Sequence, residues 1–384
     1  MSSDAVNGRF SVLIDHLTAD VITSVEQFEG LREEWDHLFN SCDNLSVWQS
    51  FTWNYVWWKH FGKGIQLSIF TVREKNMLVG IAPLMVEFRF GVNELEPIGG
   101  EHHYNFALIM DSHRDDIAAT LVHKLSTCFP KALVHIPYFA AGTVSIDIFM
   151  AALSSEGWKE ARWTRNISHY VSEGSGFDSY MANKSKKSRY NLKRERSRLD
   201  ETGLVNLHHF CLNELTDNSV ERIAQLQKKS WLARRGQESL ASPFYKEVLP
   251  ALAQNNHAEI FLYEQNSEDI AYILNLYSGD ICYCLFIGFS ETKAQLSPGK
   301  VLMMENLQKV LDRGITVYDF LYGEGEYKRF WANRTKYVCR AVCYKGFRAS
   351  AMSWFPHRLH GTFAKYQTLK NILVKIRRLK TKIF

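Results

Sequence analysis

No apolar run in the sequence reaches the roughly 18 residues that a membrane-spanning helix needs. The first ten residues, MSSDAVNGRF, lack the charged start and the apolar stretch of a secretory signal peptide. The seven cysteines are odd in number and contain no CxxC pair, which argues against a disulfide framework and against a zinc site. We therefore expect a cytoplasmic protein that binds no metal.

Acidic residues are missing from the C-terminal end of the chain. Between Tyr327 and Phe384 there are 15 Lys and Arg and no Asp or Glu, whereas residues 1–326 carry 31 basic and 41 acidic groups. The segment 351–384 places apolar residues at helical spacing with basic residues between them, which predicts a basic amphipathic helix. Three roles stay open for it: packing on the body, docking a partner, or peripheral contact with the inner face of a membrane.

Apolar residues are plentiful, at 46% of the 384 residues, and aromatic residues make up 13%. This composition is typical of packed cores, and the length favours two domains. Strand-like and helix-like stretches alternate in both halves, so we expect an α/β or mixed α+β fold. The second half contains three consecutive strands within 258–289, then a turn, a helix, a buried strand and a last antiparallel pair within 335–347. The first half shows a looser version of the same order, which suggests a duplicated fold.

The stretch Gln295–Trp331 reads as a tight turn, a helix, a short strand and a glycine-flanked loop. Ser297 is the predicted N-cap, because its hydroxyl can accept from a first-turn amide. Pro298 suits the first helical position, Gly299 lets a ligand approach the backbone, and Lys300 adds a positive charge. Free amides and the positive end of the helix dipole make this turn a candidate phosphate site. The alternative is a well-capped helix that holds no ligand.

Basic residues crowd the segment 177–203, and Lys186 and Arg189 are among its eight lysines and arginines between 184 and 198. A helix that ends near Gly203 fits this pattern. The segment is either a solvated helix face or an electrostatic guide for a polyanion, which would be a nucleotide cofactor, RNA or an anionic glycan.

Several stretches match a known family when taken in order. They are SKKSRYNLKRERSRL (185–199), DIAYILNLYSGDICYCLFIGFS, SPGKVLMMENLQKVLDRG and DFLYGEGEYKRFW, with WDHLF, SFTWNYVWWKHFG and LVGIAPL in the first half. Together they resemble the GNAT superfamily of acyltransferases, and within it the CelD-like proteins of cellulose and exopolysaccharide biosynthesis. The family's Arg/Gln-x-x-Gly-x-Gly/Ala phosphate loop is replaced here by Gln295-Leu296-Ser297-Pro298-Gly299-Lys300, in which the proline removes an amide.

The resemblance implies two GNAT-like lobes with largely antiparallel mixed sheets, as in Fem-type aminoacyl transferases. They would cover 1–175 and 176–350, the second being catalytic, with 351–384 as a C-terminal helix. It also implies acetyl-CoA or another acyl-CoA as co-substrate, and a small-molecule or glycan amine, such as an amino sugar, as acceptor.

Acyl transfer to an amine needs a held thioester, a base for the ammonium and a proton donor for the leaving thiolate. Asp319, Glu324 and Glu326 lie at or just after a strand end, where a cleft would open, and are the base candidates. Asp319 sits inside the apolar strand TVYDFLY and so also fits a structural role. Glu324 and Glu326 are flanked by glycines, which favours exposed positions.

Tyr327 is the candidate proton donor, and Lys328 and Trp331 are expected to line the cleft. The leading hypothesis is an acyl-CoA-dependent N-acyltransferase of surface-polysaccharide metabolism. One alternative is a Fem-like transferase that takes its group from aminoacyl-tRNA, in which case nucleic acid is a partner. Another is a GNAT-like scaffold in polysaccharide synthesis that binds without turnover.

Overall fold

The computed structural model describes residues 16–43, 45–89, 91–230, 239–346 and 350. The predicted helix at 351–384, and with it the predicted membrane contact, lies outside the described residues. No helix within the described part of the chain is both long and apolar enough to cross a bilayer.

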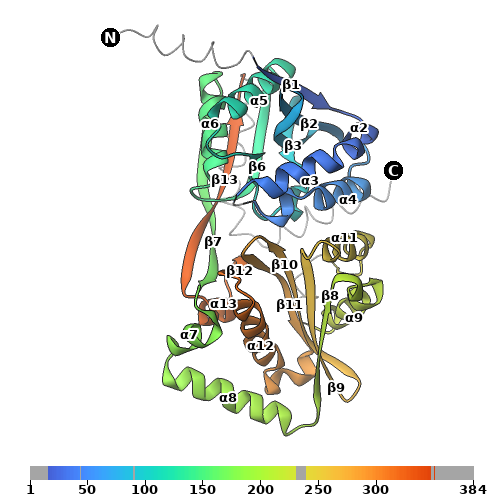
Figure 1. Ribbon diagram of the computed structural model, residues 1–384, viewed down its shortest axis with the longest axis vertical. Coiled ribbons are helices and arrows are strands. Elements are labelled where there is room, and N and C mark those ends of the chain that lie inside the picture. Colours follow the sequence, from blue (N-terminus) through green and yellow to red (C-terminus); the bar gives the residue numbers. More distant parts are fainter. Residues whose placement is uncertain (1–15, 44, 90, 231–238, 347–349, 351–384) are drawn as a thin grey trace.

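One continuous mixed sheet of thirteen strands runs through the molecule (Figure 1). Its order is β1-β2-β3-β4-β6-β13-β7-β12-β11-β10-β9-β8, and β5 pairs with β3 beside this path. The strands are β1 (Leu17–Ile22), β2 (Gln66–Glu74), β3 (Met77–Arg89), β4 (Val92–Pro97), β5 (Ile109–Met110), β6 (Ala132–Ala140), β7 (Lys159–Ser172), β8 (Val205–Cys211), β9 (Ala258–Gln265), β10 (Glu268–Ser278), β11 (Ile281–Phe289), β12 (Val317–Tyr322) and β13 (Arg334–Tyr344).

Helices cover both faces of the sheet in each lobe (Figure 1). The N-terminal lobe has α2 (Val25–Gly30), α3 (Arg32–Ser41) and α4 (Phe51–Phe61) on one face and α5 (Asp115–Cys128) and α6 (Val144–Ser155) on the other. The C-terminal lobe has α9 (Asp217–Lys228) and α11 (Pro243–Ala253) on one face and α7 (Gly176–Ala182), α8 (Lys186–Asp200), α12 (Pro298–Asp312) and α13 (Glu326–Trp331) on the other. Short 3₁₀ turns occupy Val47–Gln49, Gly100–His102, Leu212–Glu214 and Glu291–Leu296. The helices α4 and α11 pack together, so a single apolar core spans the two lobes.

The same order of elements occurs in each lobe. In the first, β2, β3 and β4 pair antiparallel, α5 follows, and β6 then lies parallel to β4. In the second, β9, β10 and β11 pair antiparallel, α12 follows, and β12 lies parallel to β11. These pairings confirm the predicted α/β class and its repeated order. The predicted boundary at residue 175 stays a prediction.

Two elements differ from the sequence-based expectation. The predicted antiparallel pair within 335–347 is wrong, because Arg334–Tyr344 is one strand, β13. It lies between β6 and β7 and pairs antiparallel with both, so the last strand among the described residues completes the sheet of the first lobe. The long strand β7 was not predicted: charged residues are frequent along KEARWTRNISHYVS, although its apolar residues Ala161, Trp163, Ile167 and Val171 all stand at odd positions.

Candidate functional site

The geometry of the site begins with a splay between two parallel strands. β11 and β12 pair only over Ile281–Tyr283 and Val317–Asp319, after which the strands diverge. Within the diverging part, the register of β11 against β10 shifts at Leu285, which marks a bulge. Because a bulge reverses the alternation of side chains, Cys284 and Ile287 face the same core although they are three residues apart.

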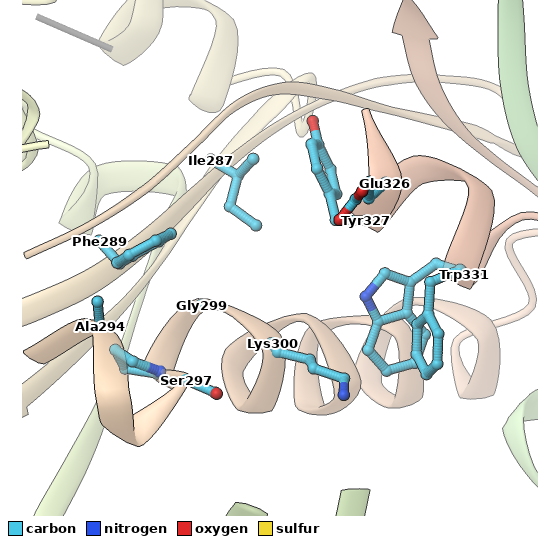
Figure 2. Close-up of a pocket in the computed structure, with 11 residues that line it drawn as sticks. Ile287, Phe289, Ala294, Ser297, Gly299, Lys300, Glu326, Tyr327 and Trp331 are labelled. Carbon is cyan, nitrogen blue, oxygen red and sulfur yellow. The ribbon is translucent and has the colours of Figure 1, made fainter. Parts of the chain in front are cut away.

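A pocket of about 500 Å³ lies beside this splay. Figure 2 shows Ile287 and Phe289 of β11 on one side, Tyr327 and Trp331 of α13 on another, and the first turn of α12 at its base. Apolar side chains dominate the lining, which consists of Ile287, Phe289, Ala294, Ser297, Pro298, Gly299, Lys300, Glu326, Tyr327, Phe330 and Trp331. The structure therefore brings together seven residues that were predicted from the sequence, namely Ser297, Pro298, Gly299, Lys300, Glu326, Tyr327 and Trp331.

The start of α12 differs from the predicted cap. Ser297 has a left-handed backbone (φ 52°), and its hydroxyl makes no capping hydrogen bond, so the predicted side-chain cap is wrong. Its carbonyl instead accepts from the amides of Lys300 (3.0 Å) and Val301 (3.2 Å). Since Pro298 has no N–H, the Gly299 amide is the one donor in this turn without a partner among the described residues. A Cβ on Gly299 would lie 3.1 Å from the Phe289 ring, so this glycine also allows close packing.

The positive charge of Lys300 is shared with a neighbour that the sequence did not point to. Its Nζ lies 3.0 Å from Glu195 Oε1 and 2.9 Å from Oε2, and sits over the Phe330 ring at 4.7 Å. Glu195 belongs to α8. The one feature of the sequence that could have pointed to it is that it is an acidic residue within a basic segment. The ion pair places α8 at the edge of the pocket.

The proposed acid–base residues divide between the pocket wall and the surface. Glu326 is exposed and lines the pocket, next to Tyr327. Burial raises the pKa of the Tyr327 phenol well above its ordinary value, so this hydroxyl stays protonated at neutral pH. Glu324 points elsewhere, because its carboxylate forms a surface ion pair with Arg329 at 2.5 Å.

Asp319 and Lys328 are buried and do not line the pocket. The Asp319 carboxylate accepts from Ser168 Oγ (2.6 Å) and from the Leu321 amide (2.8 Å), and it pairs with Lys336 Nζ at 2.7 Å. Lys328 donates from Nζ to the carbonyls of Leu321 (3.1 Å) and Tyr322 (2.8 Å), and burial lowers its pKa. Both side chains therefore hold the end of β12 in place.

A cysteine also lies near the splay, at Cys284 on β11. Burial raises the pKa of its thiol to about 11, so it remains protonated at neutral pH. Because the thiolate is the nucleophilic form, Cys284 does not offer a covalent route for a transferred group.

The basic helix α8 is present, and its charges fall into two sets. Arg189 donates to the carbonyls of Met181, Ala182 and Lys184, so it closes the end of α7 instead of facing a ligand. The other set is exposed and makes no hydrogen bond or ion pair with a described residue; it consists of Lys186, Lys187, Lys193 and Arg194. Tyr190 lies on the same face with 65% of its surface exposed.

One group of side chains in the described part of the chain has the spacing of a metal site: Glu94, Glu96 and His135. His135 Nδ1 already lies 2.5 Å from Glu96 Oε1, and Arg340 Nε lies 2.6 Å from His135 Nε2. Arg89 pairs with Glu94 at 3.5 Å. The Glu96 carboxylate and the Arg340 guanidinium thus occupy both ring nitrogens of His135, and these residues fit a charge network better than a metal centre.

A family model described as "Acetyltransferase (GNAT) domain" matches residues 186–329, a stretch that begins with α8, ends within α13 and contains nine of the eleven residues that line the pocket. No curated protein sequence matches the chain. Among solved structures, the crystal structure of FemX is similar over 86% of this chain and 97% of its own, with 12% identity and a TM-score of 0.60.

Two further structures are similar. One is the C-terminal domain of a putative lysylphosphatidylglycerol synthetase from Agrobacterium fabrum, at 8% identity and a TM-score of 0.55 over 88% of this chain and 97% of that one. The other is a conserved protein of unknown function from Bacteroides thetaiotaomicron, at 10% identity and a TM-score of 0.53 over 85% of this chain and 100% of that one. At such identities the similarity shows the fold alone, which is a GNAT fold.

Proposed function

We propose, on the premise of a GNAT domain at 186–329, that the chain is an acyltransferase that uses an acyl-CoA and acts on an amine. The observation that carries this proposal is the pocket of about 500 Å³ at the splay of β11 and β12, beside the start of α12. Its apolar lining suits the pantetheine arm and the acyl chain of such a donor. In this proposal the Gly299 amide and Lys300 meet the donor's phosphates, and the exposed cations of α8 add positive charge nearby.

In the proposed reaction, the amine nitrogen attacks the thioester carbonyl, a C–N bond forms and the C–S bond breaks. Glu326 takes the proton that the amine loses, directly or through one water. Tyr327, which lines the pocket beside Glu326, donates its phenolic proton to the leaving thiolate. Cys284 does not line the pocket and burial favours its thiol form, so we propose direct transfer from the thioester to the amine without a cysteine-bound intermediate.

The acceptor in this proposal is an amino sugar or another amine of surface-polysaccharide metabolism. The CelD-like stretches 185–199 and DFLYGEGEYKRFW carry this finer assignment. The first of them is the basic helix α8, and the second holds Glu326 and Tyr327 of the pocket wall.

Closing the pocket is expected to abolish donor binding. A Gly299→Trp side chain would enter the space beside Phe289, where even a Cβ comes to 3.1 Å. Titration calorimetry with acetyl-CoA and with longer acyl-CoAs should give saturable binding to the wild type and a loss of at least about tenfold in the variant, or about 1.4 kcal/mol.

Gly174→Trp is the matched control, since Gly174 is exposed and a Cβ there meets nothing within 4 Å. It should bind the donor as the wild type does, and thermal unfolding should show that both variants fold. Failure of the wild type to bind any acyl-CoA would refute the proposed donor.

The exposed face of α8 favours aminoacyl-tRNA as a second candidate donor. When a protein binds RNA, log affinity falls linearly with log salt concentration. Each phosphate that a lysine or arginine neutralises makes this slope steeper by about 0.7 to 0.9. Replacing Lys186, Lys187 and Arg194 with Gln should therefore lower that slope by about two units for a bound tRNA. Filter binding across a salt series measures it.

The control for this experiment replaces three exposed lysines of the other lobe, Lys63, Lys131 and Lys159, with Gln. It removes the same amount of charge, so it separates a local contact from a general effect of net charge. An equal loss in both triple variants contradicts a tRNA site on α8.

A further inference from the structure

A second cavity, of about 360 Å³, lies between the two lobes. Ile281 and Tyr283 of β11 form part of its wall, whereas Ile287 and Phe289 of the same strand line the first pocket. The bulge at Leu285 accounts for this, because it makes the odd-numbered side chains before and after it point to opposite faces of the sheet. The two openings therefore approach the splay from opposite sides, and the cavity is large enough for a small ligand.

The N-terminus of α6 opens into this inter-lobe cavity, which residues 142–145 line. The N-cap residue Thr143 does not cap the helix, since its hydroxyl donates to the Ala140 carbonyl at 2.8 Å. The amides of Val144 and Ser145 have no acceptor among the described residues. Two free N–H groups and the positive end of a twelve-residue helix thus face the cavity.

Two side chains add donors to the same place. Ser145 is only 6% exposed and lines the cavity, and its hydroxyl has no partner in the described part of the chain. Lys336 enters from β13, and its Nζ lies 2.7 Å from Asp319 Oδ2. Since an ammonium has three N–H donors, Lys336 keeps capacity for a ligand while Asp319 fixes its position.

We propose that the inter-lobe cavity binds the acidic group, a phosphate or a carboxylate, of the amine acceptor. The identification of this ligand as the acceptor rests on the acyl transfer proposed above. The donors are the amides of Val144 and Ser145, the Ser145 hydroxyl and Lys336. Asp43, which is exposed and also lines the cavity, suits the ammonium of the same molecule. An amine that carries an acidic group matches both charges.

The experiment isolates this cavity by closing the other pocket. In the Gly299→Trp protein, calorimetry with inorganic phosphate, and separately with acetate, reports on anion sites outside the donor pocket. Saturable binding of phosphate, of acetate or of both is expected, and the tighter of the two identifies the acidic group. No saturable binding of either anion would overturn the proposal.

Ser145→Asp in the same protein tests the location. A carboxylate at the second position of α6 repels an anion there, yet it suits the helix N-terminus, so the fold should be kept. Anion affinity should fall at least about tenfold, or about 1.4 kcal/mol. The matched control is Ser175→Asp, at the N-cap of α7 and outside the cavity, which should leave affinity unchanged.

Unchanged affinity in Ser145→Asp, with thermal unfolding like that of its parent, overturns the proposed site. A failure of the anion site can be told apart from a failure of the proposed function, because acyl-CoA binding is measured on proteins in which Gly299 is intact. Two results together support both assignments: the single variant Ser145→Asp, with Gly299 intact, binds acyl-CoA as the wild type does, and the double variant with Gly299→Trp loses phosphate binding. Phosphate binding without any acyl-CoA binding keeps the anion site and removes the proposed donor.

Discussion

Glu259→Ala is expected to lower the free energy of unfolding by about 3 kcal/mol, because it removes a buried carboxylate that is held ionised by its hydrogen bonds. Glu259 of β9 is 2% exposed, and its two oxygens accept from both Nη atoms of Arg313, at 2.8 and 2.9 Å. His209 Nε2 lies 2.7 Å away, and the Tyr277 hydroxyl donates to the same carboxylate. Chemical denaturation at neutral pH measures the loss.

The pH dependence gives this prediction a sign. Burial by itself raises the pKa of Glu259, but the hydrogen bonds from His209 and Arg313 outweigh burial and hold it at about 2. A carboxylate with a lowered pKa adds stability above its ordinary value near 4.5, and that contribution disappears as the pH falls toward 2. The difference in unfolding free energy between the wild type and Glu259→Ala should therefore shrink by about 3 kcal/mol as the pH falls from 4.5 to 2.

Glu264→Ala is the matched control, on the same strand. Its carboxylate is partly exposed and pairs with Arg222 at 2.7 Å, so its loss should cost at most about 1 kcal/mol. A Glu259→Ala protein as stable as this control would contradict the prediction. The outcome bears on function, since Arg313 ends α12, whose other end is the base of the donor pocket.

Trp331→Ala is expected to cost about 3–5 kcal/mol of unfolding free energy and to abolish donor binding. The indole is 1% exposed and forms a wall of the pocket, so its removal leaves a cavity in the core and opens the site. The Trp331 carbonyl accepts from the Tyr180 hydroxyl and from Lys184 Nζ at 2.9 Å, which keeps the backbone in place. Denaturant unfolding and acyl-CoA calorimetry measure the two effects.

Trp163→Ala serves as the comparison, because Trp163 is only partly buried and lies in the other lobe. It should cost less stability and leave donor binding intact. Trp331→Phe separates folding from binding, since the smaller ring keeps the core filled but withdraws surface from the donor. Normal acyl-CoA affinity in Trp331→Phe, with a folded Trp331→Ala that also binds, would contradict a wall role for this residue.

The local chemistry of the chain pointed to seven of the eleven residues that line the pocket at the start of α12. Ser297, Pro298, Gly299 and Lys300 mark a turn that begins a helix, and such signals depend on neighbouring residues alone. The strand series before it and the buried strand after it were also predictable from runs of apolar residues. Those runs gave the fold class and the repeated order of elements.

Contacts between distant residues could not be predicted in this way. Glu195 pairs with Lys300 across 105 positions, which no pattern in a single sequence reveals. The left-handed backbone of Ser297 was also not predicted, because a positive φ is rare outside glycine and depends on how the preceding turn packs. β7 was missed for a related reason: much of it is half-exposed and links the lobes, so its pattern follows no single core face.

The position of β13 between β6 and β7 has a consequence for how the protein is made. β6 ends at Ala140 and its neighbour β13 ends at Tyr344, so the ribosome adds 204 residues between them. At about 5–20 residues per second, this takes roughly 10 to 40 s. During that time β6 has an open edge that later synthesis must fill, and nascent chains are exposed there to wrong pairing. The first lobe therefore becomes complete only after nearly the whole chain has been translated.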